Sequence, residues 1–231
     1  MRHDVFGRLV VVTVLLFALG CAASAPPEML TRTSRFDAPV ALPPIDVAAT
    51  DSLSNALSTR RSVREYSQQP LDIEVIGQLF WAAQGVTDAR GHRTAPSAGA
   101  RYPLEVYAIT SNRVLHYLPS GHEVESRPDD RVLASLADAA FGQEFVSDAP
   151  AVVVITAVVA RTEQEYGAVA PDLVNREAGH AAQNVLLQAT ALDLAHVPVG
   201  GFDPASVADL LALPPGEEPL YLIPIGQHLG G

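Results

Sequence analysis

One segment constrains the fold of this chain more than any other, an almost unbroken run of β-branched and small apolar residues from Ala151 to Val159. A run of this composition with no polar face is typical of a central strand that is buried on both faces of a sheet. The chain has 231 residues, of which 48% are hydrophobic, so it contains enough apolar side chains to cover such a strand on both sides.

The other elements are expected before and after this strand. Alternating residues between short turns predict successive antiparallel strands at 104–110, 114–118 and 122–126, and a last strand at 220–225. Apolar residues at helical spacing predict helices at 53–60, 70–84, 132–141, 172–195 and 203–213. Because strands and helices do not alternate regularly, we expect an α+β domain whose central, mostly antiparallel sheet is flanked by helices.

The first 50 residues are expected to precede this domain, which we place at 51–231. Residues 1–20 resemble an export signal, because their apolar run of about 11 residues is too short for a membrane span of roughly 20. Cys21, the only cysteine, resembles a lipobox cysteine that becomes lipidated; the alternative is ordinary signal cleavage that removes it. Residues 21–50 are rich in Ala and Pro and are expected to form a tether. These features predict an exported cell-envelope protein, either lipid-anchored or periplasmic, that meets the membrane only through a lipid anchor.

Charge and composition exclude several functional classes. The sequence has 15 arginines and no lysine, so it cannot provide a lysine Schiff base, a P-loop lysine or a kinase lysine. The formal net charge of -11 argues against general nucleic-acid binding. No cysteine remains in the expected domain for a disulfide, a metal–thiolate site or a thiol nucleophile.

The strongest candidate site is a basic cluster at the end of the first expected helix, formed by Arg60, Arg61, Ser62 and Arg64. Guanidinium groups present planar sets of donors that match phosphate oxygens, and a serine hydroxyl adds a donor beside them. The cluster therefore suits a fixed phosphate. The alternative is a solvated basic helix end.

Two further segments could contact a ligand. Val199, Gly200 and Gly201 lie in a turn between two expected helices, where backbone N–H groups can approach a flat ligand without a side chain in the way. Pro96, Ser97, Ala98 and Gly99 belong to a loop that precedes the first strand. Taken separately, each segment could also be an ordinary connection.

The order of these motifs resembles the FMN-dependent nitroreductase superfamily, and in particular its SagB-type branch, which includes azoline oxidases. The resemblance covers roughly residues 42–226. It rests on the three segments above together with Glu177-Ala178-Gly179-His180, Pro219-Leu220-Tyr221-Leu222-Ile223-Pro224-Ile225-Gly226 and Leu79-Phe80-Trp81-Ala82-Ala83-Gln84-Gly85-Val86-Thr87.

The resemblance implies an intertwined homodimer with FMN bound at the subunit interface. Arg60, Arg61, Ser62 and Arg64 would hold the FMN phosphate and ribityl chain. Pro96, Ser97, Ala98 and Gly99 would approach the flavin from the other subunit. Val199, Gly200 and Gly201 would lie by the isoalloxazine ring. Since the flavin carries the hydride, no catalytic side chain is required for that step.

This chain departs from the family pattern in three respects. No Arg or Lys follows the last expected strand. The Lys-Tyr pair associated with azoline oxidases has no lysine here, which leaves Tyr166 as the nearest catalytic candidate and puts azole formation in doubt. Export would separate the protein from soluble NAD(P)H. The expected function is hydride transfer between FMN and a small-molecule or peptidic substrate with an unknown electron donor. The alternatives are a flavin- or ligand-binding lipoprotein without turnover and a structural lipoprotein.

The histidines suggest no metal site. Glu177 and His180 have the i, i+3 spacing found in di-iron bundles, but such a site needs a second copy and more carboxylates. We expect His180 to pack in a helix interface. His116, His122 and His228 are expected to be exposed.

Overall fold

The computed structural model describes residues 36–45 and 53–230, which all belong to one compact unit. Cys21 and the segment expected to be an export signal lie outside the described residues. Within the described part of the chain, no helix is long and apolar enough to cross a membrane.

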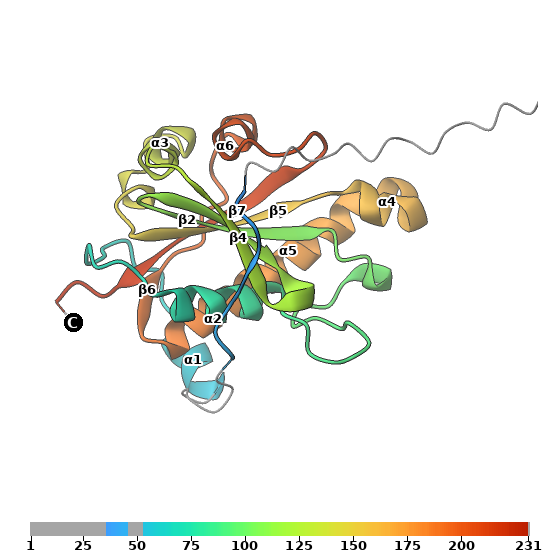
Figure 1. The fold of residues 1–231 in the computed structure, drawn as a ribbon, viewed down its shortest axis with the longest axis horizontal. Helices are drawn as coiled ribbons and strands as arrows, with labels where there is room; N and C mark the ends of the chain where they lie inside the picture. Colours follow the sequence, from blue (N-terminus) through green and yellow to red (C-terminus); the bar gives the residue numbers. More distant parts are fainter. Residues whose placement is uncertain (1–35, 46–52, 231) are drawn as a thin grey trace, which may run out of the picture. The chain divides into compact units, whose positions relative to one another are not determined.

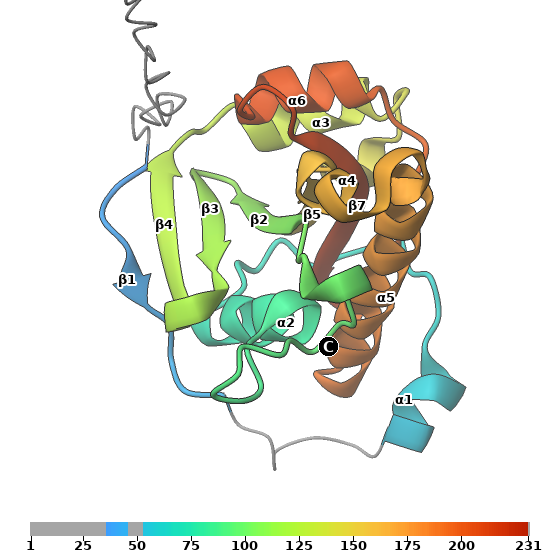
Figure 2. The same ribbon diagram turned by 90° about the vertical axis from the view of Figure 1, so that its right-hand side faces the viewer.

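The described residues form one seven-stranded sheet in the order β1-β4-β3-β2-β5-β7-β6 (Figures 1 and 2). Each pair of neighbouring strands is antiparallel, which confirms the expected fold class. The strands are β1 (Val40–Ala41), β2 (Leu104–Thr110), β3 (Arg113–Leu118), β4 (Glu123–Pro128), β5 (Ala151–Ala157), β6 (Leu194–His196) and β7 (Glu218–Gln227).

Strand β5 is the central element that its composition predicts. It lies between β2 and β7, and all seven of its residues are buried. Its side chains point alternately into two cores: Val153 and Ile155 pack into one, and Val152 and Val154 into the other. This two-sided burial explains why the segment lacks a polar face.

Helices cover both faces of the sheet. Figures 1 and 2 show α2 and α5 against one face, with α3 and α6 against the other. The helices are α1 (Leu53–Thr59), α2 (Ile73–Gln84), α3 (Val132–Ala139), α4 (Ala160–Tyr166), α5 (Ala170–Ala191) and α6 (Pro204–Leu211).

The predicted helix boundaries are partly explained by capping. Asp72 takes the extended conformation of an N-cap before α2, but its side chain makes no capping hydrogen bond. Gly85 ends α2, with its amide bonded to the carbonyl of Trp81 at 2.7 Å. Before α6, the Asp203 carboxylate accepts the amide of Ser206 at 3.0 Å, so this cap is formed in full.

Three elements differ from the sequence expectation. Helix α5 ends at Ala191 and Asp193 adopts a left-handed φ of 55°, so β6 occupies the end of the predicted helix. Helix α4 has no counterpart among the expected helices. In the expected tether, β1 pairs with β4, and Leu42 is buried with only 7% exposure.

The sheet has two ends that position the candidate site. At one end of β5, Ala151 pairs with Ile225 of β7, and Ile225 in turn pairs with His196 of β6. At the other end, Ala157 pairs with Leu104 of β2. The two ends of β5 are about 20 Å apart, given a rise of ~3.3 Å per residue.

Candidate functional site

The basic cluster lies against the β6 edge of the sheet. The amide of Val63 donates to the carbonyl of His196 at 2.9 Å, and Tyr66 forms an antiparallel bridge with His228. The amide of Ser67 then donates to the carbonyl of Gln227 at 3.0 Å. The chain carrying the cluster is therefore fixed to the sheet rather than hanging free at a helix end.

The guanidinium groups of this cluster have different surroundings. Among the described residues, neither Arg60 nor Arg64 forms an ion pair with a carboxylate. The Arg64 guanidinium lies 5.4 Å from the centroid of the Phe145 ring. Arg61 instead donates through Nη1 to the carbonyls of Ser58 and Arg60, at 3.1 and 2.8 Å. The surface therefore combines positive charge with few internal partners, as an anion site requires.

His196 is a buried neighbour of this cluster that no sequence motif singles out. Its Nε2 lies 2.9 Å from Thr190 Oγ1, which itself donates to the carbonyl of Leu186 at 2.8 Å. Since the threonine proton is used there, Nε2 of His196 carries a proton and Nδ1 is left as a buried acceptor without a partner among the described residues. Burial lowers the pKa of His196 to about 4, and the charges of Arg60 and His228 contribute to this shift in the same direction.

The glycine turn lies on the same edge, a short distance along β7. Val199 exchanges two backbone hydrogen bonds with Leu222, at 2.7 and 3.0 Å. Beyond it, the amides of Gly200 and Gly201 form no backbone hydrogen bond with a described residue. A Cβ atom added at Gly200 would find no described atom within 4 Å, and Gly200 does not have a left-handed φ. The fold of the single chain therefore does not itself require glycine at position 200.

Strand β6 brings together the basic cluster, called the arginine segment below (residues 60–64), and the glycine turn (residues 199–201). His196 binds Val63, and the chain continues from His196 to the turn beside β7. Four residue steps separate His196 from Gly200, about 13 Å at ~3.3 Å per residue. This edge of the sheet can therefore offer guanidinium donors to an anion at one point. A short distance away it offers backbone amides that have no backbone partner among the described residues.

The Pro96 loop lies elsewhere, across the sheet beside β2 and α4. Ser97 Oγ accepts the amide of Tyr102 at 2.8 Å, and Gly99 has a left-handed φ of 56°. A Cβ at Gly99 would lie 2.9 Å from both the Tyr166 hydroxyl and Glu165 Oε2, which are the movable ends of their side chains, so it is the left-handed φ that favours glycine here. The structure therefore places the catalytic candidate Tyr166 beside the loop, and does not bring this loop to the β6 edge within one chain.

A buried polar group lies beneath the Pro96 loop. Glu177 of α5 is only 3% exposed, and burial raises the pKa of its carboxyl to about 7, opposed by Ser97 and the charge of Arg93. Arg93 Nη1 donates to Gln84 Oε1 at 2.8 Å, and its guanidinium lies 4.4 Å from the Tyr102 ring centroid. His180 is exposed in the single chain, so the expected packing of this histidine is not seen there and it does not converge with Glu177.

The expected exposure of His116 is wrong. Its side chain is buried between two carboxylates, with Nε2 2.9 Å from Glu105 and Nδ1 2.7 Å from Glu125. His122 is partly buried, and Nδ1 lies 2.9 Å from the Tyr117 hydroxyl. These partners come from neighbouring strands, so local polarity does not indicate the burial.

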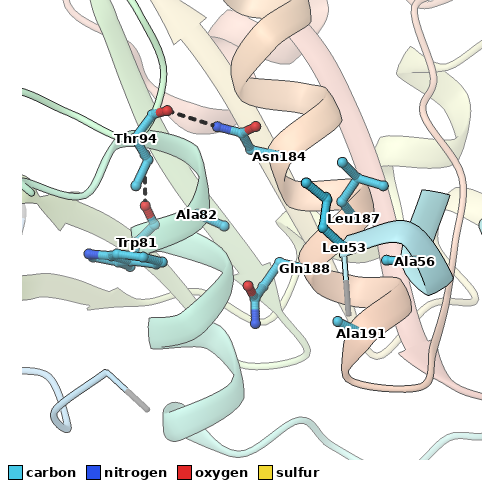
Figure 3. Close-up of a pocket in the computed structure, with 9 residues that line it drawn as sticks. All are labelled: Leu53, Ala56, Trp81, Ala82, Thr94, Asn184, Leu187, Gln188 and Ala191. Carbon is cyan, nitrogen blue, oxygen red and sulfur yellow. Dashed lines mark hydrogen bonds between the residues drawn. The ribbon is translucent and has the colours of Figure 1, made fainter. Parts of the chain in front are cut away.

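A shallow hollow of about 320 Å³ is lined by none of the predicted site residues (Figure 3). It is formed by α1, α2 and α5 together with part of the loop that follows α2. In this loop the carbonyl of Thr94 accepts a hydrogen bond from Asn184 of α5 at 3.3 Å. Its lining is mostly apolar. The lining residues are Leu53, Ala56, Trp81, Ala82, Thr94, Asn184, Leu187, Gln188 and Ala191.

Comparison with known proteins places this fold. Residues 57–227 match the model of the nitroreductase family. A nitroreductase homologue from Methanocaldococcus jannaschii is 41% identical over 183 residues, which are 77% of this chain and 91% of that protein. A nitroreductase homologue of known structure from Ralstonia eutropha is 29% identical, with a TM-score of 0.75 over 84% of this chain and 90% of that chain.

A more distant likeness concerns the fold alone. The NADPH:FMN oxidoreductase of Vibrio harveyi, solved in complex with NAD+, is 21% identical. The match has a TM-score of 0.57 and covers 76% of this chain and 68% of that chain. The antiparallel sheet, the family match over residues 57–227 and the 41% identical relative together establish that this chain belongs to the nitroreductase family, whose members are flavin-dependent oxidoreductases.

Proposed function

We propose that this protein is an FMN-dependent oxidoreductase that transfers a hydride between the flavin and a small-molecule or peptidic substrate. The proposal rests on two features of one sheet edge. The guanidinium groups of Arg60 and Arg64 have no carboxylate partner among the described residues. Near them, the amides of Gly200 and Gly201 have no backbone hydrogen-bond partner among those residues. Membership of the nitroreductase family supports the same conclusion, and the Vibrio harveyi oxidoreductase of similar fold acts with FMN.

The residues present fit this cofactor. Arg60 and Arg64 offer charged donors to a phosphate, and the exposed hydroxyl of Ser62 lies between them in the chain. Gly200 and Gly201 offer amide donors on a surface without side chains, as a flat ring requires. FMN, when bound, would supply the hydride chemistry, while the chain binds and orients it.

We further propose that the active form is a homodimer. The Pro96 loop and Tyr166 lie across the sheet from the β6 edge, so a second copy is needed if they are to reach the same flavin. Leu53 and Leu57 of α1 are 65% and 57% exposed beside the hollow, which is the apolar surface that a second copy would cover. Replacing both leucines by Arg is expected to give monomers, as measured by light scattering. A variant that remains dimeric would show that this face is not the dimer interface.

We propose that the protein acts on the same class of substrate as the SagB-type branch, but that it does not form azoles. Tyr166 supports a role in proton transfer, because its hydroxyl reaches the Pro96 loop next to Gly99. With no lysine available, Tyr166 would act alone. Tyr166→Phe is then expected to lower turnover with little effect on the FMN dissociation constant, whereas unchanged turnover would remove Tyr166 from the reaction.

We also propose export to the cell envelope with lipidation at Cys21, on the strength of the N-terminal sequence. The electron donor would then differ from soluble NAD(P)H. Membrane fractionation of Cys21→Ser tests the anchor: the variant should leave the membrane fraction, and retention there would contradict the anchor.

Anaerobic photoreduction of the FMN-loaded protein tests turnover. The proposal predicts that quinones or nitroaromatic compounds reoxidise the flavin well above the rate without acceptor. Protein that holds FMN but shows no acceptor-dependent reoxidation would instead be a flavin-binding protein without turnover.

A further inference from the structure

The side chain of Gln143 holds the glycine turn in place. Gln143 lies between α3 and β5, and its Nε2 donates to the carbonyl oxygens of Ala140 and Gly201, at 2.7 and 2.8 Å. Both acceptors are backbone carbonyls, so only the amide nitrogen can occupy this position and the orientation of the side chain is unambiguous. One side chain thus links the end of α3 to the turn.

The turn is fixed on both sides of this contact. Val199 is bound to Leu222, and the amide of Asp203 donates to the carbonyl of Ala139 at 2.8 Å. Gln143 binds the Gly201 carbonyl between these two points. Because a peptide group is planar, the bond from the Leu222 amide to the Val199 carbonyl fixes the amide of Gly200, and the bond from Gln143 to the Gly201 carbonyl fixes the amide of Phe202. The amide of Gly201 lies between these two fixed peptide groups, which limits its rotation.

The segment that contains Gln143 also contacts the arginine segment. Phe145 lies under the Arg64 guanidinium. Residues 143–145 therefore touch both parts of the proposed FMN site, although no sequence motif marks them. Outside that site, Gln68 Nε2 donates to the carbonyl of Asp148 at 2.9 Å.

We propose that Gln143 is a positioning residue that orients the Gly200–Gly201 turn toward the flavin ring and so sets the relative affinity for oxidised and reduced flavin. This inference rests on the proposed FMN function. Amide donors aimed at the ring nitrogen that takes up the hydride would favour oxidised flavin, in which this nitrogen can accept a hydrogen bond. In reduced flavin the same nitrogen carries hydrogen, so these amides would fit the reduced ring less well.

The test compares Gln143→Leu with Gln68→Leu. The two glutamines each donate to a backbone carbonyl of this region, but only Gln143 reaches the turn. Gln143→Leu is expected to change the ratio of affinities for oxidised and reduced FMN by up to roughly tenfold, which raises the two-electron midpoint potential by about 30 mV. Gln68→Leu should leave the potential at the wild-type value.

A second variant and a second readout keep the test independent of turnover. In Gln143→Glu the carboxylate has no proton to donate, so the clamp should be lost at pH 8 and partly recovered as the carboxyl is protonated toward pH 5. Amide hydrogen exchange of FMN-free protein should become faster at residues 199–203 in both Gln143 variants and not in Gln68→Leu.

The outcomes separate the two claims. A wild-type protein that binds no FMN would contradict the proposed function. If the wild-type protein binds FMN, but both Gln143 variants keep its midpoint potential and its exchange rates at the turn, the role of Gln143 is overturned while the proposed function stands.

Discussion

The backbone amide of Val63 donates to the carbonyl oxygen of His196 at 2.9 Å, and this bond joins the arginine segment to the sheet. Because β6 leads directly into the glycine turn, the two candidate ligand-binding segments are parts of one edge. Their relative positions are therefore set by strand pairing rather than by flexible connections.

Removing two guanidinium groups from this edge should weaken FMN binding. Each charge-assisted hydrogen bond is worth about 1.5–3 kcal/mol, so Arg60→Ala with Arg64→Ala should raise the dissociation constant at least tenfold. Fluorescence titration with FMN measures it. Arg131→Ala, an exposed arginine at the start of α3, is the matched control and should bind as the wild type does. Equal affinities for all three proteins would argue against the phosphate assignment.

A larger side chain at position 200 should impair FMN binding without impairing folding. Gly200→Val places a side chain where no described atom lies within 4 Å, in a backbone conformation that is not left-handed. We expect the melting temperature of the FMN-free protein to be kept or slightly raised, because the unfolded chain loses freedom. FMN binding should be strongly impaired. A Gly200→Val variant that binds FMN normally would remove the turn from the site, while Ala205→Val on α6 serves as a control for surface substitution.

Buried His196 should make the fold sensitive to acid. Its pKa is lowered to about 4, whereas in the unfolded chain it returns to about 6.5. Between these values the unfolded state binds a proton that the folded state does not, so stability falls as the pH drops from 6.5 toward 4, by up to about 3 kcal/mol. Urea unfolding at several pH values should show a smaller loss for His196→Gln. His92→Gln, at an exposed position, should retain the wild-type loss.

Buried Glu177 should act in the opposite direction. Its pKa is raised to about 7, so the folded state keeps a proton that the unfolded state releases above about 4.5. Stability is then lost as the pH rises from 4.5 to 7. Glu177→Gln should match the wild type near pH 4 and exceed it at pH 8, by up to about 3 kcal/mol in urea unfolding. A constant difference across this range would show that the carboxyl does not titrate as the burial implies.

Strands β2, β3, β4, β5 and β7 were predictable because each has a local signature. The apolar run of β5 and the alternation in β2 reflect their own burial, so periodicity suffices for them. Strand β6 was not predictable, because Leu194 and Ala195 extend the apolar pattern of α5 and only the left-handed Asp193 separates the two elements. The polar helix α4 carries no apolar stripe.

The candidate site was predictable only where its chemistry is carried by a motif. Arginines and paired glycines stand out in a sequence, so the two segments on the β6 edge could be proposed from residue types alone. His196 and Gln143 could not, because their roles depend on partners outside their own sequence motifs. Gln143 is 58 residues from Gly201, and no spacing rule connects them.

The most direct test of the central claim is the visible spectrum of the purified domain after incubation with FMN and removal of free flavin. We predict a bound flavin spectrum with about one FMN per chain, and its loss in the protein that carries Arg60→Ala and Arg64→Ala. A colourless wild-type protein whose melting temperature does not change with added FMN would contradict the claim.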